Sequence, residues 1–284
     1  MKQFKNIVLF IFLAAFAFSC EKHAVEYKTT DAAGLAEYQL HYFVPLAAST
    51  ANNIYRVEVN GVVVANKSAP LTTYNAIPSG GVGRFYTVTP GTINIKLYQG
   101  TGETLVYDKS CTVKPGKQNI FVYDFNQDPI VFDNGYPYVP EVTENTGTTG
   151  WVKFYNFLFE AGGAPVTFKL QYQYQYTVDN STGQKSDWIN LGDPVGFGEA
   201  TGWVGLPVNK TIFNSSGSAR IDYRANVINN DGSDGGLLQV KNSSGNMVNY
   251  TDWWTLSIGR RFHQVLSGYR MQSPYCAVRQ FTAL

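Results

Sequence analysis

Residues 170–178 read LQYQYQYTV, in which a tyrosine recurs at every second position. Successive side chains of a β-strand point to opposite faces of the sheet. Tyr172, Tyr174 and Tyr176 therefore share one face with Leu170 and Val178, and the glutamines between them share the other. The tyrosine row is interpreted either as the buried face of a strand or as an exposed platform on which a sugar could stack. Aliphatic residues at both ends of the row favour the core, with Tyr172 deep and Tyr176 near the rim.

The same alternation, broken by turns, recurs along most of the chain. In IYRVEVNGVVVANK, two alternating segments flank Asn60-Gly61, a pair typical of a two-residue hairpin turn. Further turns are expected at Pro90-Gly91, residues 100–102 and Pro115-Gly116, a spacing typical of β-sandwiches. No convincing amphipathic helix follows the first residues. The sequence therefore predicts an all-β fold made of antiparallel sandwiches.

The chain divides into five predicted parts. We expect a signal peptide at residues 1–19, a lipidated cysteine and tether at 20–33, and a first β-sandwich at 34–133. A linker rich in Gly and Pro at 134–150 would lead to a second β-sandwich at 151–284. The second part begins, like the first, with an aromatic strand, a short loop and an alternating strand, which indicates a weak internal repeat.

The first residues are typical of an exported protein. Lys2 and Lys5 precede an apolar run over residues 7–18, which is too short to span a bilayer. The run ends in AFSC, which resembles a bacterial lipobox, although Ala17 stands where Leu or a β-branched residue is usual. The resemblance implies cleavage before Cys20 and its acylation, which would make membrane lipid a partner. We expect a lipid anchor in the outer membrane, at the cell surface rather than on the periplasmic face; the alternative is ordinary secretion with Cys20 incidental.

Charge and cysteine content limit the partners. The formal net charge is +1 and no block of Lys or Arg stands out, so the sequence does not favour nucleic acid. Cys111 and Cys276 lie in different halves of the chain. A disulfide is permitted in an oxidising compartment, but two free thiols are the favoured interpretation.

The sequence offers little catalytic chemistry. His23, His41 and His263 are far apart, and no zinc-binding spacing, nucleophile elbow or phosphate-binding loop occurs. We therefore expect no enzyme activity, no cofactor and no bound metal. Residues 229–236, NNDGSDGG, gather oxygen donors that could hold calcium, but the same residue types are ordinary turn formers.

Aromatic residues are the candidate ligand-binding groups. Trp188 and Trp203 bracket a glycine-rich insert, and Trp253 and Trp254 are neighbours, so on a strand one must face outward. Exposed rings bind sugars by stacking, while nearby polar groups bond the hydroxyls. These four tryptophans and Tyr176 form the predicted site. The alternative is that the rings close the open end of the sandwich.

The first half also resembles a known family. Its elements are the Val-Asn-Gly hairpin, the Pro-Gly before TINIKLYQ, and the Pro-Gly-Lys before NIFVYD, within residues 38–126. They are similar to an uncharacterised family of immunoglobulin-like β-sandwich lipoproteins of the bacterial envelope, of the Bacteroidota type and often in tandem. The resemblance implies an architecture and a location, and it brings no catalytic residues.

These observations lead to a functional hypothesis. We expect a non-catalytic outer-membrane lipoprotein that binds an extracellular polymer, with glycan as the first candidate. The alternatives are an adhesion or fimbria-like structural subunit and an accessory subunit of an outer-membrane complex. In both alternatives the partner would be another envelope protein.

Overall fold

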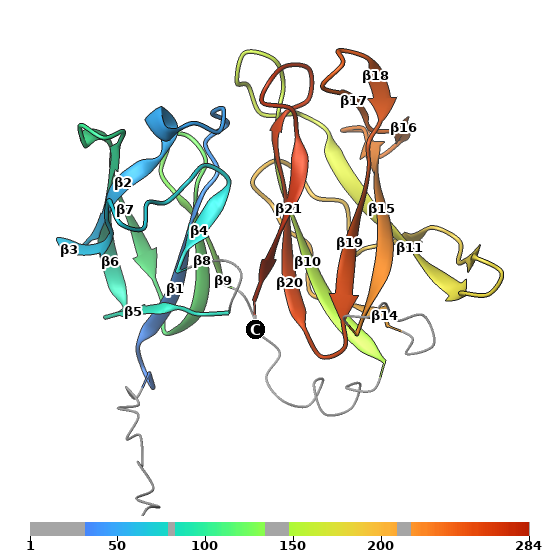
Figure 1. Cartoon of the computed structure of the whole chain (residues 1–284), viewed down its shortest axis with the longest axis horizontal. Coiled ribbons are helices and arrows are strands. Elements are labelled where there is room, and N and C mark those ends of the chain that lie inside the picture. Colours follow the sequence, from blue (N-terminus) through green and yellow to red (C-terminus); the bar gives the residue numbers. More distant parts are fainter. Residues whose placement is uncertain (1–31, 79–82, 134–147, 209–216, 284) are drawn as a thin grey trace, which may run out of the picture. The chain divides into compact units, whose positions relative to one another are not determined.

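The computed structural model describes residues 32–78, 83–133, 148–208 and 217–283 (Figure 1). The predicted signal peptide, Cys20 and almost all of the predicted tether lie outside these residues, as does most of the predicted linker. Residues 33–284 form one compact unit. In the described part, no helix has the length and apolar character needed to cross a membrane.

The described residues form an all-β fold of several, mostly antiparallel sheets. In the N-terminal half, one sheet has the order β4-β1-β8-β9 with β5 beside β1, and the other has the order β3-β2-β6-β7. The bounds are β1 (Ala36–Tyr42), β2 (Ile54–Val59), β3 (Val62–Ala65), β4 (Asn75–Ile77), β5 (Tyr86–Val88), β6 (Gly91–Gln99), β7 (Thr104–Val113), β8 (Gly116–Val122) and β9 (Ile130–Asp133), with a 3₁₀ turn at Thr50–Asn52. The predicted β2–β3 hairpin is confirmed, because Asn60 and Gly61 both have positive φ, as the turn requires.

The C-terminal half repeats this plan with longer strands. One sheet has the order β14-β10-β20-β21; the other has the order β12-β11-β15-β16, with β13 beside β11 and β19 beside β15. A small sheet pairs β17 with β18. The bounds are β10 (Thr149–Phe159), β11 (Lys169–Asp179), β12 (Gln184–Lys185), β13 (Ile189–Asn190), β14 (Val204–Pro207), β15 (Ser218–Ile228), β16 (Asp234–Leu237), β17 (Gln239–Lys241), β18 (Met247–Asn249), β19 (Thr251–Ser257), β20 (Arg261–Tyr269) and β21 (Ala277–Thr282).

The two halves share an uncommon pairing pattern. Strand β1 runs parallel to β8, and the last strand of that half, β9, pairs antiparallel with β8. In the same way β10 runs parallel to β20, and β21 pairs antiparallel with β20. Strands β2 and β6 pair antiparallel, as do β11 and β15. This agreement fits the internal repeat that the sequence indicated.

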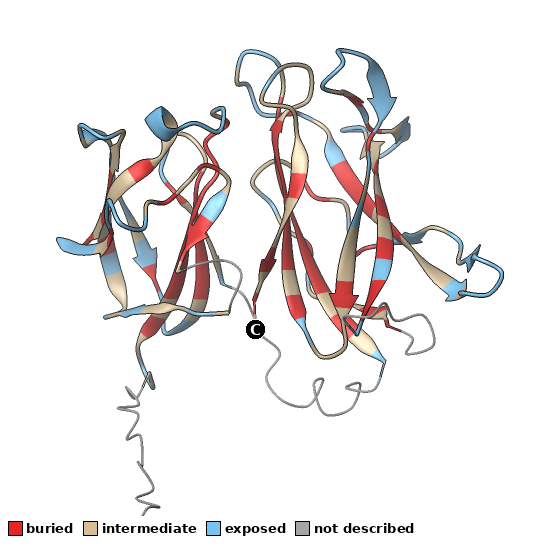
Figure 2. Cartoon of the chain, in the orientation of Figure 1, coloured by how far each residue is buried: buried red, intermediate tan, exposed pale blue. Residues whose placement is uncertain are grey.

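Each half has its own apolar core between its two sheets. One core joins residues of β1 and β8 to residues of β2, β6 and β7, and the other joins β10 and β20 to β11, β15 and β19. Figure 2 shows the buried positions concentrated along the middle of these strands. The apolar positions of the alternating sequence pattern therefore correspond to the inner face of each sheet.

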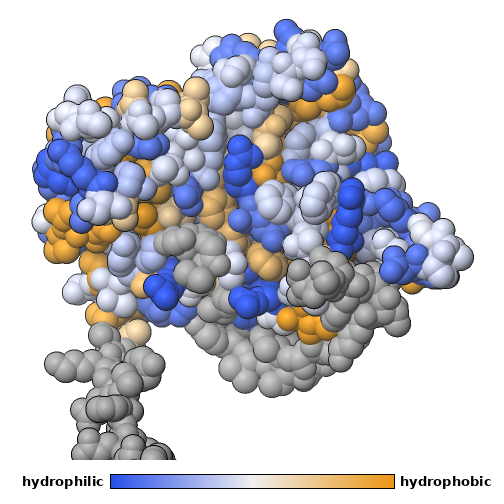
Figure 3. Space-filling model, viewed as in Figure 1, coloured by the Kyte–Doolittle hydropathy of each residue, from blue (hydrophilic) through white to orange (hydrophobic). Residues whose placement is uncertain are grey.

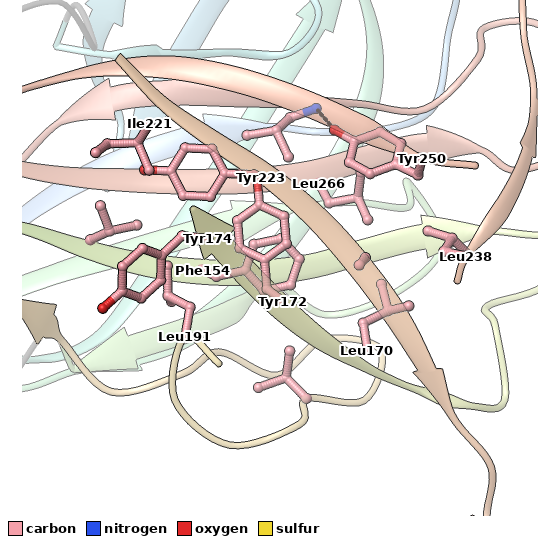
Figure 4. Packing of buried hydrophobic residues seen from close by; sticks show 14 of the residues in the cluster. Phe154, Leu170, Tyr172, Tyr174, Leu191, Ile221, Tyr223, Leu238, Tyr250 and Leu266 are labelled. Atoms are coloured by element: carbon pink, nitrogen blue, oxygen red, sulfur yellow. Dashed lines mark hydrogen bonds between the residues drawn. The ribbon is translucent and has the colours of Figure 1, made fainter. Parts of the chain in front are cut away.

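The tyrosine row of β11 lies in the C-terminal core, as predicted. Leu170 and Tyr172 are fully buried, Tyr174 is 6% exposed, and Tyr176 is half-buried at the rim. The Tyr172 ring lies parallel to Phe154, with centroids 4.1 Å apart, and to Tyr223, with centroids 5.1 Å apart (Figure 4). Stacked rings contribute beyond their buried area, so Tyr172 is a central element of this core.

Val178 does not follow the tyrosines into the core. This residue is 44% exposed, although it shares the parity of the tyrosines. The pairing of β11 with β12 shifts register between Thr177 and Asp179, where β11 leaves the core and enters a hairpin. Alternation predicts a face only as long as the pairing is regular.

A third apolar cluster joins the two halves. Phe43 and Phe121 of the N-terminal half meet Tyr155, Phe157 and other aromatic residues of the C-terminal half. The rings of Phe121 and Phe157 are stacked, with centroids 4.9 Å apart. The contact between the halves is thus built like a core.

Two buried histidines lie within this cluster. The rings of His41 and His263 are 6.5 Å apart, and Asn119 Nδ2 is 2.9 Å from His263 Nε2. Tyr155 Oη lies 2.8 Å from His263 Nδ1. Burial lowers the pKa of His41 to about 3, while burial and the charges of His41 and Lys153 hold the pKa of His263 well below its usual range. Both imidazoles are therefore neutral at pH 7.

The Tyr172 hydroxyl has no hydrogen-bond partner among the described residues. Two substitutions at this position should therefore change the free energy of unfolding differently. Tyr172→Ala should lower the free energy of unfolding by about 3–5 kcal/mol, because it leaves a cavity between two rings. Tyr172→Phe should leave it unchanged or raise it by about 1 kcal/mol, because it removes an unsatisfied buried group. Chemical denaturation measures both, and an unchanged midpoint for Tyr172→Ala would contradict the core position.

The buried histidines predict a loss of stability in mild acid. Below pH 6.5 the unfolded chain binds protons at His41 and His263 that the folded chain excludes, so stability present at neutral pH falls as the pH drops. Between pH 7 and pH 5 the loss should approach about 2 kcal/mol for His41, and His263 should add to it in the same direction. Denaturation of His41→Phe, which keeps a ring beside Phe121, should show a shallower pH dependence than the parent chain. Identical pH profiles would contradict the assignment.

Candidate ligand site on the outer face of β11, β15 and β19

The row of glutamines on β11 defines the outer face of the C-terminal half. Because the tyrosines point into the core, Gln173 and Gln175 point away from it. Gln175 is paired across the sheet with Asp222 of β15, which is paired with Trp253 of β19. Gln173 is likewise paired with Arg224 and then with Thr251. The outer face therefore carries two cross-strand rows of polar and aromatic side chains.

An open hollow of about 440 Å³ lies on this face. It is lined by polar, charged and aromatic residues: Gln175, Lys185, Trp188, Arg220, Asp222, Tyr223, Thr251, Asp252 and Trp253. Strands supply most of these residues, while Trp188 comes from the segment between β12 and β13. Two tryptophans far apart in the sequence thus line one site.

The hollow is held together by charge pairs. Asp222 accepts hydrogen bonds from Arg220 Nε, at 2.7 Å, and from Lys185 Nζ. Burial raises the pKa of the Asp222 carboxyl, but the hydrogen bonds and charges of Lys185 and Arg220 outweigh burial and hold this pKa below its usual range. Asp222 is therefore ionised at neutral pH and fixes the two cations around it.

An arginine stacks on the ring of each tryptophan that lines the hollow. Arg220 Cζ lies 4.7 Å from the ring centre of Trp253, and Arg224 Cζ lies 4.4 Å from that of Trp188. Such contacts are worth about 0.5–1 kcal/mol at exposed positions. Arg224 Nε also donates to Gln173 Oε1 at 2.7 Å, and Gln173 Nε2 donates to Asn190 Oδ1 at 2.8 Å. The glutamine row thus orients the arginine that supports Trp188.

The structure brings only two of the five predicted site residues together. Trp188 and Trp253 meet at the hollow, and Trp253 remains 51% exposed. Trp254 points the other way and packs against the core, as alternation required of one of the two neighbours. Tyr176 packs at the core rim and does not line the hollow. Trp203 lies 5.1 Å from the His263 ring, because its segment leads into β14 of the other sheet.

The charged residues of β15 were missed in the sequence. The segment RIDYRANV, residues 220–227, alternates as LQYQYQYTV does, with Arg220, Asp222 and Arg224 on one face and apolar or aromatic residues on the other. This alternation was the available signal. What it did not contain was the register that places these residues opposite the glutamines.

Asp222 and Asp252 both line the hollow, but their side chains belong to opposite faces of the sheet. Asp222 is paired with Trp253 and points outward, whereas Asp252 is paired with Tyr223, which is buried. Burial raises the pKa of Asp252, and its carboxylate accepts a hydrogen bond of 3.0 Å from the Tyr250 hydroxyl in the core. Asp222 instead bonds Lys185 and Arg220, and Asp252 bonds Tyr250, so each carboxyl group has partners within the protein.

The loop at residues 229–236 is built as a set of turns. Asp231 Oδ1 accepts from the backbone N–H of Ser233 at 2.9 Å and from its hydroxyl at 2.6 Å. Asn229 Nδ2 donates to Ser233 Oγ at 3.0 Å. Within the described ranges, no group of three His, Cys, Asp or Glu side chains is placed to hold a metal. The oxygen donors of this loop thus serve its own backbone.

The two cysteines of the described part are free thiols. Cys111 and Cys276 are each half-buried and unbonded, so the favoured prediction of free thiols is confirmed. Burial raises the pKa of Cys111 to about 11 and that of Cys276 to about 12. Both are therefore protonated and poorly nucleophilic at neutral pH.

A second surface lies at the edge strand β3. Val62 and Val63 are 64% and 50% exposed, and within the described residues β3 pairs only with β2. A hollow of about 410 Å³ separates β3 from β5 and is lined mainly by valines and tyrosines. Figure 3 shows hydrophobic residues gathered at the left of the view, where β3 lies. This edge differs in character from the polar outer face of β11 and β15.

Comparison with known proteins identifies no family. No protein-family model matches the chain, and no curated protein matches its sequence. Among solved structures, the chain is similar to a leucine-rich repeat protein from Bacteroides thetaiotaomicron, at 12% identity and a TM-score of 0.21, over 83% of this chain and 26% of that one. It is also similar to a putative cell adhesion protein from Bacteroides fragilis, at 9% identity and a TM-score of 0.25, over 88% of this chain and 97% of that one. The chain thus spans about a quarter of the first protein's length, and scores of this size transfer neither activity nor ligand.

Proposed function

We propose that this chain is a non-catalytic lipoprotein of the outer membrane that binds an extracellular glycan in the hollow on β11, β15 and β19. The observation that carries the proposal is that two tryptophan rings, Trp188 and Trp253, each stacked on an arginine, line one hollow together with polar side chains. A ring face can stack on the C–H face of a pyranose, while Gln175, Asp222 and Lys185 can bond hydroxyls. No cofactor or metal is needed for this activity.

Rigidity supports binding in this hollow. Asp222 and Gln173 fix the arginines, and the arginines in turn limit the rotation of the rings. A site that is already ordered loses less conformational entropy when ligand binds. The opposite orientations of Asp222 and Asp252 favour binding over hydrolysis.

The location and architecture belong to the same proposal. Acylation of Cys20 would anchor the chain in the outer membrane and present the hollow at the cell surface. The shared pairing pattern of the two halves supports a tandem of immunoglobulin-like β-sandwiches. The near-neutral charge makes glycan a better candidate than nucleic acid.

Binding of the purified full chain to a glycan array tests the proposal. We expect a subset of glycans to bind, and we expect Trp253→Ala and Trp188→Ala each to weaken binding about tenfold or more, because each removes a stacking surface. Trp253→Phe should retain part of the affinity. Leu105→Ala is the matched control, because Leu105 is equally exposed on a strand but lies far from the hollow in the pairing order. Absence of any bound glycan, or binding that neither tryptophan substitution weakens, would refute the proposal.

The exposed edge at β3 favours a second candidate, an adhesion or assembly subunit. An unpaired edge strand with apolar side chains can pair with a strand of another chain. In that case the full chain should form concentration-dependent oligomers in light scattering, and Val63→Lys should disperse them. A chain that stays monomeric at high concentration would argue against this candidate and leave the glycan proposal intact.

A further inference from the structure

The charge beside Trp188 distinguishes between classes of glycan. The hollow itself is lined by two cations, Lys185 and Arg220, and by the carboxyl residues Asp222 and Asp252, while Arg224 follows on the same face of β15 and stacks on Trp188. Asp222 is already bonded to both Lys185 and Arg220. Arg224 makes no ion pair among the described residues. A ligand that stacks on Trp188 could therefore supply the carboxylate that Arg224 lacks.

Arg224 is also held in a defined position. Its Nε donates to Gln173 Oε1 at 2.7 Å, and its guanidinium lies 4.4 Å from the ring centre of Trp188. Within the part of the chain that the structure describes, both terminal nitrogens of Arg224 lack a hydrogen-bond partner. An arginine fixed through Nε and the ring face presents a planar pair of donors, the geometry that binds a carboxylate in bidentate fashion.

We propose that the glycan bound in this hollow is acidic, and that Arg224 binds the carboxylate of a uronic acid unit beside Trp188. This inference rests on the proposed function and narrows its ligand. The stacked ring would bind the sugar's C–H face while Arg224 pairs with the carboxylate. Arg220, stacked on Trp253 and bonded to Asp222 through Nε alone, keeps its own terminal nitrogens available for a second acidic unit.

The test uses ligands that differ only in the carboxyl group. Homogalacturonan, alginate and hyaluronan are each compared with their carboxyl-reduced, neutral counterparts in binding to the full chain. We expect at least one acidic polymer to bind about tenfold more tightly than its neutral counterpart, with a preference that declines as salt is raised. Arg224→Gln should bring the ratio of acidic to neutral affinity close to one. Arg224→Lys should restore part of that ratio, since it keeps the charge but loses the planar fork.

The controls distinguish a failure of the acidic-ligand proposal from a failure of the glycan-binding proposal. Lys67→Gln removes an exposed cation of the N-terminal half and should leave the ratio unchanged. Thermal unfolding of each variant checks that the fold is intact. Binding of neutral glycans without acidic preference, or an Arg224→Gln variant that loses affinity for both ligands equally, would overturn the acidic assignment while the glycan proposal stands. If no glycan binds at all, the proposed function itself fails.

Discussion

Strand β11 can bury only one of its two faces, and the outer surface of the C-terminal half depends on which face that is. Tyr172 and Tyr174 carry far more apolar area than the glutamines between them, so burial of the tyrosines fixes the orientation of the strand. The stacking of Tyr172 between Phe154 and Tyr223 then ties β11 to both sheets of this half. Gln173 and Gln175 are left on the outside as a consequence. The core and the candidate site are thus two results of one constraint.

That constraint explains how much the sequence could predict. Alternation over residues 170–176 identified a strand and its buried face from side-chain chemistry alone, and Asn60-Gly61 identified a hairpin from the positive φ that its turn needs. Alternation does not predict the exposure of Val178, because the register shift after Thr177 depends on the partner strand. Local patterns thus predict elements and their faces where the pairing is regular.

The candidate site was only half predictable for the same reason. Trp188 and Trp253 could be named as exposed rings, but nothing local indicated that they share a hollow. They are 65 positions apart in the chain, and the pairing of β11, β15 and β19 brings them together. Arg224 was missed because its importance comes from its register opposite Gln173. The same holds for His41 and His263, which the sequence presents as unrelated and which the fold brings to 6.5 Å of each other. Contacts between distant segments require the pairing of strands, which composition and spacing do not contain.

The buried histidines also give the contact between the two halves a role that an apolar cluster would not have. Phe121 and Phe157 supply attraction without direction, whereas the amide of Asn119 and the hydroxyl of Tyr155 bind the two nitrogens of one imidazole, His263, from different halves of the chain. Such polar contacts are satisfied in few orientations, because a misplaced half would leave buried polar groups without partners. Apolar area therefore stabilises the contact, and the imidazole selects its geometry. This specificity depends on a neutral ring, which burial maintains by lowering the pKa of His263.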